Sequence, residues 1–210
     1  MMSAAMATRV KGAAILDGVS VVREVCGAVR FEKLVLACPQ DTQKLLQRTM
    51  MAIEWVSLDL WTPFLEVLHA QLALHDELRF RRLIRAFCQR DFQTIYRPYI
   101  QSATAISLCP KIPQIWSAYF ESGSLLPSAL SSQNDVYAVS VQLRDLVSES
   151  PLVTTMVHSY IEQVLTMVGA KECQVTRGKE ARHQQTRHSC EYLIRFRLGA
   201  SRALEPLTRS

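Results

Sequence analysis

Apolar residues recur at helical spacing through most of the first 120 positions of the chain. The clearest case begins at Asp76, a residue type that caps helix N-termini. Four apolar residues then follow a three- and four-residue spacing: Phe80, Leu83, Ile84 and Phe87. We expect the other helices in these ranges: 20–37 with a break at Gly27, from Asp41 onward, 55–72, 92–100 and 112–120.

Beyond Gly123 the apolar period changes from helical spacing to two. From Asp135 to Leu143 apolar and polar residues alternate, which predicts a half-buried strand. Leu125 and Leu126 precede a turn-rich segment and are the expected hairpin partner of that strand.

One further helix and two strands complete the chain. Ser150-Pro151 predicts a helix start and Gly169 its end, and the apolar surface between them is wide enough to be covered on two sides. Strands are expected over 172–176 and 190–197, joined by a basic loop. The loop is expected to hold these residues: Arg177, Lys179, Arg182, His183, Arg187 and His188.

This order predicts an α+β fold with N-terminal helices packed on a small antiparallel sheet. The C-terminal half runs strand, strand, helix, strand, strand. No linker or repeat divides the sequence, so we expect one domain over residues 9–198 with short tails at 1–8 and 199–210.

Composition indicates the partners and the cellular compartment of the protein more clearly than it indicates a reaction. The formal charge of +5 permits an acidic partner, but no nucleic-acid-binding motif accompanies it, so we do not expect nucleic acid as a partner. Six scattered cysteines indicate reduced thiols and a cytoplasmic location. We find neither an export signal nor an 18-residue apolar window, and therefore expect no transmembrane segment.

Several short motifs carry a resemblance that covers nearly the whole chain. They are Val10-Lys11-Gly12, Val22-Arg23-Glu24, Trp55 with Leu58 and Leu60, Trp116 with Tyr119-Phe120 and Gly123, and Cys190-Glu191-Tyr192. Together they resemble a paralogous family of unknown function, of similar length to this chain, that is expanded in myxobacteria.

The C-terminal half also resembles the vinyl-reductase-type small-molecule-binding domain. That domain is related in fold to haem-type nitric-oxide sensors and to transport-particle (TRAPP) subunits. Cys173, Gly178, Cys190 and Tyr192 match its terminal pattern, whereas the longer basic segment around Gly178 departs from it. The resemblance implies a fold and a sensor or scaffold role without naming a ligand.

Three groups of residues are candidates for a site. An aromatic and methionine set would form either ordinary core or the wall of a pocket for a small hydrophobic ligand: Trp55, Trp61, Phe64, Trp116, Tyr119, Phe120, Met156 and Tyr160. A second set would bind zinc if paired strands brought its cysteines together, and otherwise holds free thiols or a redox pair: Cys173, His183, His188 and Cys190. The third would face an anionic partner or simply solvent: Arg177, Lys179, Arg182 and Arg187, with the arginine-rich helix after Asp76.

The remaining histidines suggest no catalytic centre. His158 and Glu162 are expected as an exposed helix pair without a nucleophile. His69 and His75 are expected at a helix boundary, with haem ligation as their alternative.

We therefore expect a non-enzymatic cytoplasmic signalling or scaffold domain that binds a small hydrophobic ligand or a protein partner and forms a homodimer. No cofactor is expected. The alternative is a metal- or cofactor-dependent sensor that uses Cys173 and Cys190 with His183 and His188, holding zinc or haem. An enzyme is the weakest hypothesis, because no phosphate-binding loop, paired-carboxylate motif or nucleophile signature occurs.

Overall fold

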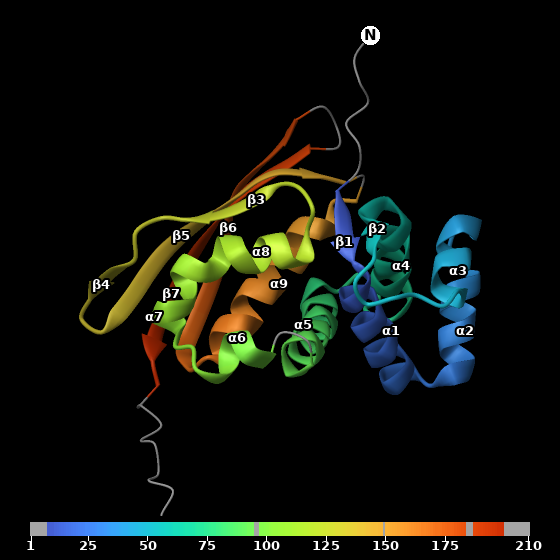
Figure 1. Ribbon diagram of the computed structural model, residues 1–210, viewed down its shortest axis with the longest axis horizontal. Helices are drawn as coiled ribbons and strands as arrows, with labels where there is room; N and C mark the ends of the chain where they lie inside the picture. The colour runs from blue at the N-terminus through green and yellow to red at the C-terminus, as the bar shows by residue number, and fades with distance from the viewer. Residues whose placement is uncertain (1–7, 95–96, 149, 184–186, 200–210) are drawn as a thin grey trace, which may run out of the picture.

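The computed structural model describes residues 8–94, 97–148, 150–183 and 187–199. Within them the chain forms an α+β fold in which helices cover one face of a twisted antiparallel sheet (Figure 1). The helices are α1 Gly12–Cys26, α2 Ala28–Leu36, α3 Gln40–Gln47, α4 Leu58–Gln71, α5 Glu77–Gln93, α6 Arg97–Gln101, α7 Ala105–Leu108, α8 Ile112–Tyr119 and α9 Leu152–Met167. The strands are β1 Arg9–Lys11, β2 Trp55–Ser57, β3 Ser124–Pro127, β4 Ser131–Gln133, β5 Val136–Val147, β6 Ala170–His183 and β7 Arg187–Leu198.

The helix start predicted at Asp76 and the break predicted at Gly27 are confirmed, and a further cap occurs at Ser57. The Ser57 hydroxyl accepts from the Asp59 amide at 3.3 Å and caps α4. The Asp76 carboxylate accepts from the Arg79 amide at 3.0 Å and caps α5. Gly27 has φ of 77° and separates α1 from α2, which is the break that the sequence predicts.

The main sheet has the strand order β3-β5-β7-β6, with β4 also paired to β5. Leu125 and Leu126 pair with Leu143 and Gln142, so the predicted hairpin is confirmed. The buried residues of β7 alternate along the strand and face the helices: Cys190, Tyr192, Ile194 and Phe196.

The prediction of a basic loop between the last two strands is wrong. Residues 177–183 continue β6 and residues 187–189 begin β7, and Arg182 pairs with His188 across the two strands. The long partner strand explains the difference, because most of the added residues of β6 pair with β7, the exceptions being Gly178 and Lys179 at a bulge. Residues 184–186 lie outside the described residues.

Two short strands near the N-terminus tie the helices to the sheet. Val10 pairs with Val56 in the β1-β2 ladder and forms a bridge with Phe120 after α8. The Thr8 hydroxyl accepts from the Val147 amide at 3.0 Å. Residues 55–57, which we expected at the start of a helix, form β2 instead, because they pair with β1.

Helix α9 lies at the centre of the molecule, between the sheet and the N-terminal helices (Figure 1). One side packs against β6 and β7, and another packs against α4 and α5. This is the two-sided cover that its wide apolar surface predicts. In the described part of the chain, no helix is both long and apolar enough to cross a membrane.

Candidate functional site: an apolar cavity beside helix α9

An apolar cavity of about 90 Å³ lies between α9 and α8, with walls from α1, α4, α5, β1 and β3. Its aromatic lining consists of Trp61, Phe87, Phe92, Trp116, Tyr119, Phe120 and Tyr160. The aliphatic and sulfur-containing lining consists of Val10, Ala14, Leu58, Leu108, Ile112, Ile115, Leu125, Met156, Val157, Ile161, Val164 and Leu165. Helix α9, which lies between β5 and β6 in the sequence, therefore meets the helices that precede the sheet at this cavity.

Six of the eight residues proposed for a pocket are brought together here: Trp61, Trp116, Tyr119, Phe120, Met156 and Tyr160. The other two lie elsewhere. Trp55 is in β2, where the Lys11 ammonium sits 3.7 Å from its ring centroid. Phe64 is fully buried against Trp61 and Phe31, with ring centroids at 5.4 and 6.0 Å, and it forms core.

The size of the cavity limits what it admits. Ligand pockets for drug-sized molecules are roughly 300–1,000 Å³, whereas engineered apolar cavities of about 150 Å³ bind benzene or xenon. A space of about 90 Å³ therefore suits a small apolar molecule, from a diatomic gas to a few carbon atoms. Its apolar walls favour a ligand that needs few hydrogen bonds.

A buried carboxyl group stands behind the aromatic wall. The Tyr160 hydroxyl donates to Asp91 Oδ2 at 2.7 Å, and Asp91 is only 1% exposed. Burial raises the pKa of the Asp91 carboxyl well above its usual range, although the hydrogen bond from Tyr160 acts in the opposite direction. Burial also raises the pKa of Tyr160, and the nearby Asp91 adds to that rise. Both shifts favour the neutral form of the group concerned.

The opposite side of α9 carries a polar network rather than the exposed pair that we expected. His158 is 5% exposed and accepts from the Arg81 guanidinium at 3.0 Å. Glu162 accepts from Arg81 at 2.5 Å and also from Arg85. Spacing along α9 places His158 and Glu162 on one face, but it does not reveal that α5 covers that face. Burial and the neighbouring Arg81 lower the pKa of His158 to about 4, so its ring is neutral at physiological pH.

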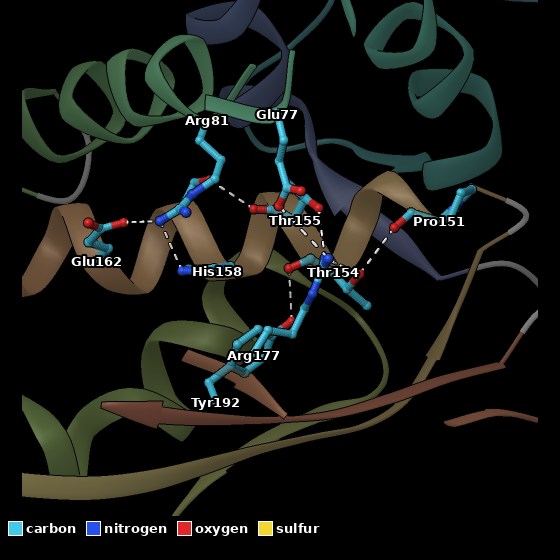
Figure 2. Close-up of polar contacts among 10 residues, drawn as sticks. Glu77, Arg81, Pro151, Thr154, Thr155, His158, Glu162, Arg177 and Tyr192 are labelled. Atoms are coloured by element: carbon cyan, nitrogen blue, oxygen red, sulfur yellow. Dashed lines mark hydrogen bonds and ion pairs between the residues drawn. The ribbon is translucent and has the colours of Figure 1, made fainter. Parts of the chain in front are cut away.

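Arg177 extends this network from the sheet. Its guanidinium donates to the Thr155 hydroxyl at 2.8 Å and lies 3.8 Å from the Glu77 carboxylate of α5. Figure 2 shows Arg81 and Glu77 reaching α9 from one side and Arg177 reaching it from the strands. Arg177 thus contacts the interior face of α9. The side chains of Lys179, Arg182 and Arg187, which we proposed with it as an anionic-partner surface, lie outside the described side chains.

The residues proposed for zinc do not converge in the described structure. Cys190 is opposite Glu180, whereas Cys173 lies at a bulge between Lys171 and Gln174. The β6 position opposite Cys190 is seven residues after Cys173, which is a distance on the order of 20 Å along the strand. The buried His188 ring is 3.0 Å from the Ser148 carbonyl, and the His183 side chain lies outside the described side chains. No group of three or more metal-binding side chains occurs among the described residues.

The structure is similar to solved H-NOX domains, so the expected likeness to haem-type sensors is confirmed at the level of fold. One neighbour, solved for insights into the molecular mechanism of H-NOX activation, has a TM-score of 0.62 at 10% identity over 91% of this chain and 98% of its own. An oxygen-binding H-NOX domain related to soluble guanylate cyclases, in its oxygen complex, has a TM-score of 0.57 at 9% identity over 90% and 95%. A third, solved to study how protein-induced porphyrin distortion modulates haem redox potential, has a TM-score of 0.57 at 9% identity over 90% of this chain and 95% of its own.

Sequence comparisons add nothing to this assignment. No family model matches the chain, and no curated protein matches it. At identities of 9–10% the structural likeness establishes the fold alone.

These neighbours overturn our expectation of no cofactor, because they point to haem rather than to none. They also favour the cofactor-dependent alternative over the main interpretation, although with haem in place of a metal held by Cys173 and Cys190. Whether haem fits this particular chain depends on the residues around the cavity.

The described cavity does not fit haem. Protein ligands of haem iron are histidine, cysteinate, methionine and tyrosine side chains. No histidine or cysteine is among the described lining residues. Met156, Tyr119 and Tyr160 are present, and the Tyr160 phenol is hydrogen-bonded to Asp91. His69 is instead engaged with the rings of His75 and Phe80, at 5.3 and 5.2 Å. A space of about 90 Å³ is also well below the size of cofactor pockets.

Proposed function

We propose that the chain is a signalling sensor domain in which a small apolar molecule occupies the cavity beside α9. The observation that carries the proposal is the cavity itself, an apolar space beside the central helix of a fold shared with sensor domains. A gas or a short hydrocarbon meets both the size and the polarity of this space.

The position of α9 supplies a means of transmitting occupancy. Met156 and Tyr160 face the cavity, while His158 and Glu162, each two positions further along, belong to the network with α5. A ligand that displaces the cavity wall must shift α9, and this shift changes the contacts of the same helix with α5 and β6.

The second candidate function is a haem-dependent sensor, which the fold likeness favours. The cavity would have to enlarge and the hydrogen bonds around Asp91 would have to rearrange before this chain held a porphyrin. Membership of the myxobacterial family, a homodimer, a protein partner, the absence of enzymatic activity and a single domain over 9–198 are further parts of the proposal and await their own tests.

An NMR titration with cyclopropane tests the leading candidate. With ¹³C-methyl methionine labelling, we expect the Met156 methyl signal to shift saturably, because the side chain lines the cavity. Val164→Phe fills the space and should abolish the shift. Val175→Phe, at a half-buried β6 position outside the lining, is the matched control and should keep it.

A haem titration separates the two candidates. A Soret band that saturates at one equivalent, together with a Met156 signal unmoved by cyclopropane, would establish the haem-dependent function and refute direct ligand binding. No saturating Soret band, together with a Met156 signal that shifts with cyclopropane, supports the leading proposal.

A further inference from the structure

The network between α5, α9 and β6 contains more positive than negative charge. Three guanidinium groups, from Arg81, Arg85 and Arg177, face two carboxylates, from Glu162 and Glu77. Glu162 is shared, because one of its oxygens accepts from both Arg81 and Arg85. The cluster therefore retains about one unit of uncompensated positive charge in a partly desolvated position.

Several N–H donors of the cluster lack a protein acceptor. An arginine side chain can only donate, so the contact from Arg81 fixes His158 Nε2 as the acceptor and places the ring proton on Nδ1. His158 Nδ1 is buried and meets no acceptor among the described residues, and the same holds for Nε of Arg81 and of Arg85. His158 is more than nine-tenths buried. Leaving such donors unpaired is unfavourable, so the site is suited to an acceptor from solution.

The cluster is also accessible at its edges. The Arg81 side chain is 16% exposed, and the Arg85 and Arg177 side chains are 32% and 31% exposed. Figure 2 places Arg81 and Arg177 on either side of α9, with His158 beneath Arg81. An acceptor from solvent can reach the exposed parts of these guanidinium groups, whereas contact with the buried Nε and Nδ1 atoms requires the side chains to move.

We propose that Arg81, Arg85 and His158, with Arg177 nearby, form a binding site for a small oxyanion, either a phosphate group or a carboxylate. The excess positive charge and the unpaired donors select an anion over water. Guanidinium forks match the spacing of oxygens on both groups. The site is separate from the cavity, since its residues are not among those that line it.

An NMR titration with inorganic phosphate tests the site, with acetate as a parallel titration and sodium chloride at matched ionic strength as the reference. We expect saturable shifts of the His158 ring and Arg81 Nε signals with an oxyanion and none with chloride. Tighter binding of phosphate assigns a phosphate group as the natural ligand, and tighter binding of acetate assigns a carboxylate; both support the site.

Two arginines on α5 supply the matched variants. Arg85→Met should weaken oxyanion binding about tenfold or more, because a charged donor is lost while Glu162 keeps Arg81. Arg82→Met removes the same charge from an exposed position and should bind as the unchanged protein does. No saturable shift in the unchanged protein, or equal weakening in both variants, would overturn the proposal. Circular dichroism confirms that each variant is folded.

Discussion

Asp91 is a buried carboxyl group that accepts a hydrogen bond from Tyr160, and its burial has a consequence for stability. Its pKa in the folded protein is raised well above the value of about 3.9 for an unfolded chain. At pH values below about 3.9 the Asp91 carboxyl is protonated in both the folded and the unfolded protein, so its ionisation does not lower the free energy of unfolding. As pH rises toward the folded pKa, the unfolded state ionises first, so the folded state loses relative stability.

We therefore predict that Asp91→Asn, whose side chain is neutral at every pH, gains stability relative to the original protein as pH increases above about 4. Urea unfolding at a series of pH values measures the difference. Asp59→Asn, at a partly exposed position on α4, is a comparison variant. A difference that stays constant with pH, or falls, would mean that Asp91 ionises freely in the folded state.

The sequence indicates which residues belong to the site more readily than it indicates how deeply each side chain is buried. Tyr160 and Met156 are recognisable as cavity candidates because they belong to an apolar helical stripe. The burial of His158 is not recognisable from the sequence, since it depends on which helix covers it. The position of Asp91 is recognisable, because it lies four residues after Phe87 and seven after Ile84 and so falls on the apolar stripe of α5.

At the scale of elements, Arg177 joins a strand to the helix that borders the cavity. From β6, the Arg177 guanidinium donates to the Thr155 hydroxyl at 2.8 Å. From β7, the Tyr192 hydroxyl donates to the Thr154 carbonyl at 2.9 Å. These contacts hold the start of α9 on the sheet, where the alternation of β6 and β7 presents inward-facing side chains.

Arg177→Met should reduce the free energy of unfolding by about 1–2 kcal/mol, because it removes hydrogen bonds from a charged donor while keeping most of the side-chain volume. Arg195→Met, on the exposed face of β7, should change it by less than about 0.5 kcal/mol. Chemical denaturation of the three proteins provides the comparison. Equal effects of the two substitutions would show that Arg177 does not anchor α9.

The sequence predicts the types of most elements but not the lengths of the strands. Periodicity locates β5 and β7, and the cap residue Asp76 locates α5. The charged residues after Thr176 favour a loop by composition, yet pairing with β7 keeps them in β6. The bulge near Cys173 also sets a register that no single-sequence pattern specifies, and this register separates Cys173 from Cys190.

At the scale of the molecule, the fold resembles haem-containing sensors while the cavity lining favours a smaller, apolar occupant. Fold and function separate in this way because the ligand is selected by side chains, and the same backbone arrangement tolerates many sets of them. In this chain, helix α9 lies between the sheet and the N-terminal helices, with the cavity on one side and the polar network on the other.

A crystal structure of the protein under xenon pressure tests the central claim most directly. We predict xenon density in the cavity beside Met156 and Tyr160, with a displacement of α9 against α5 relative to the unpressurised crystal. An empty cavity, with xenon only at surface sites or nowhere, would contradict the proposal that this space receives a small apolar ligand.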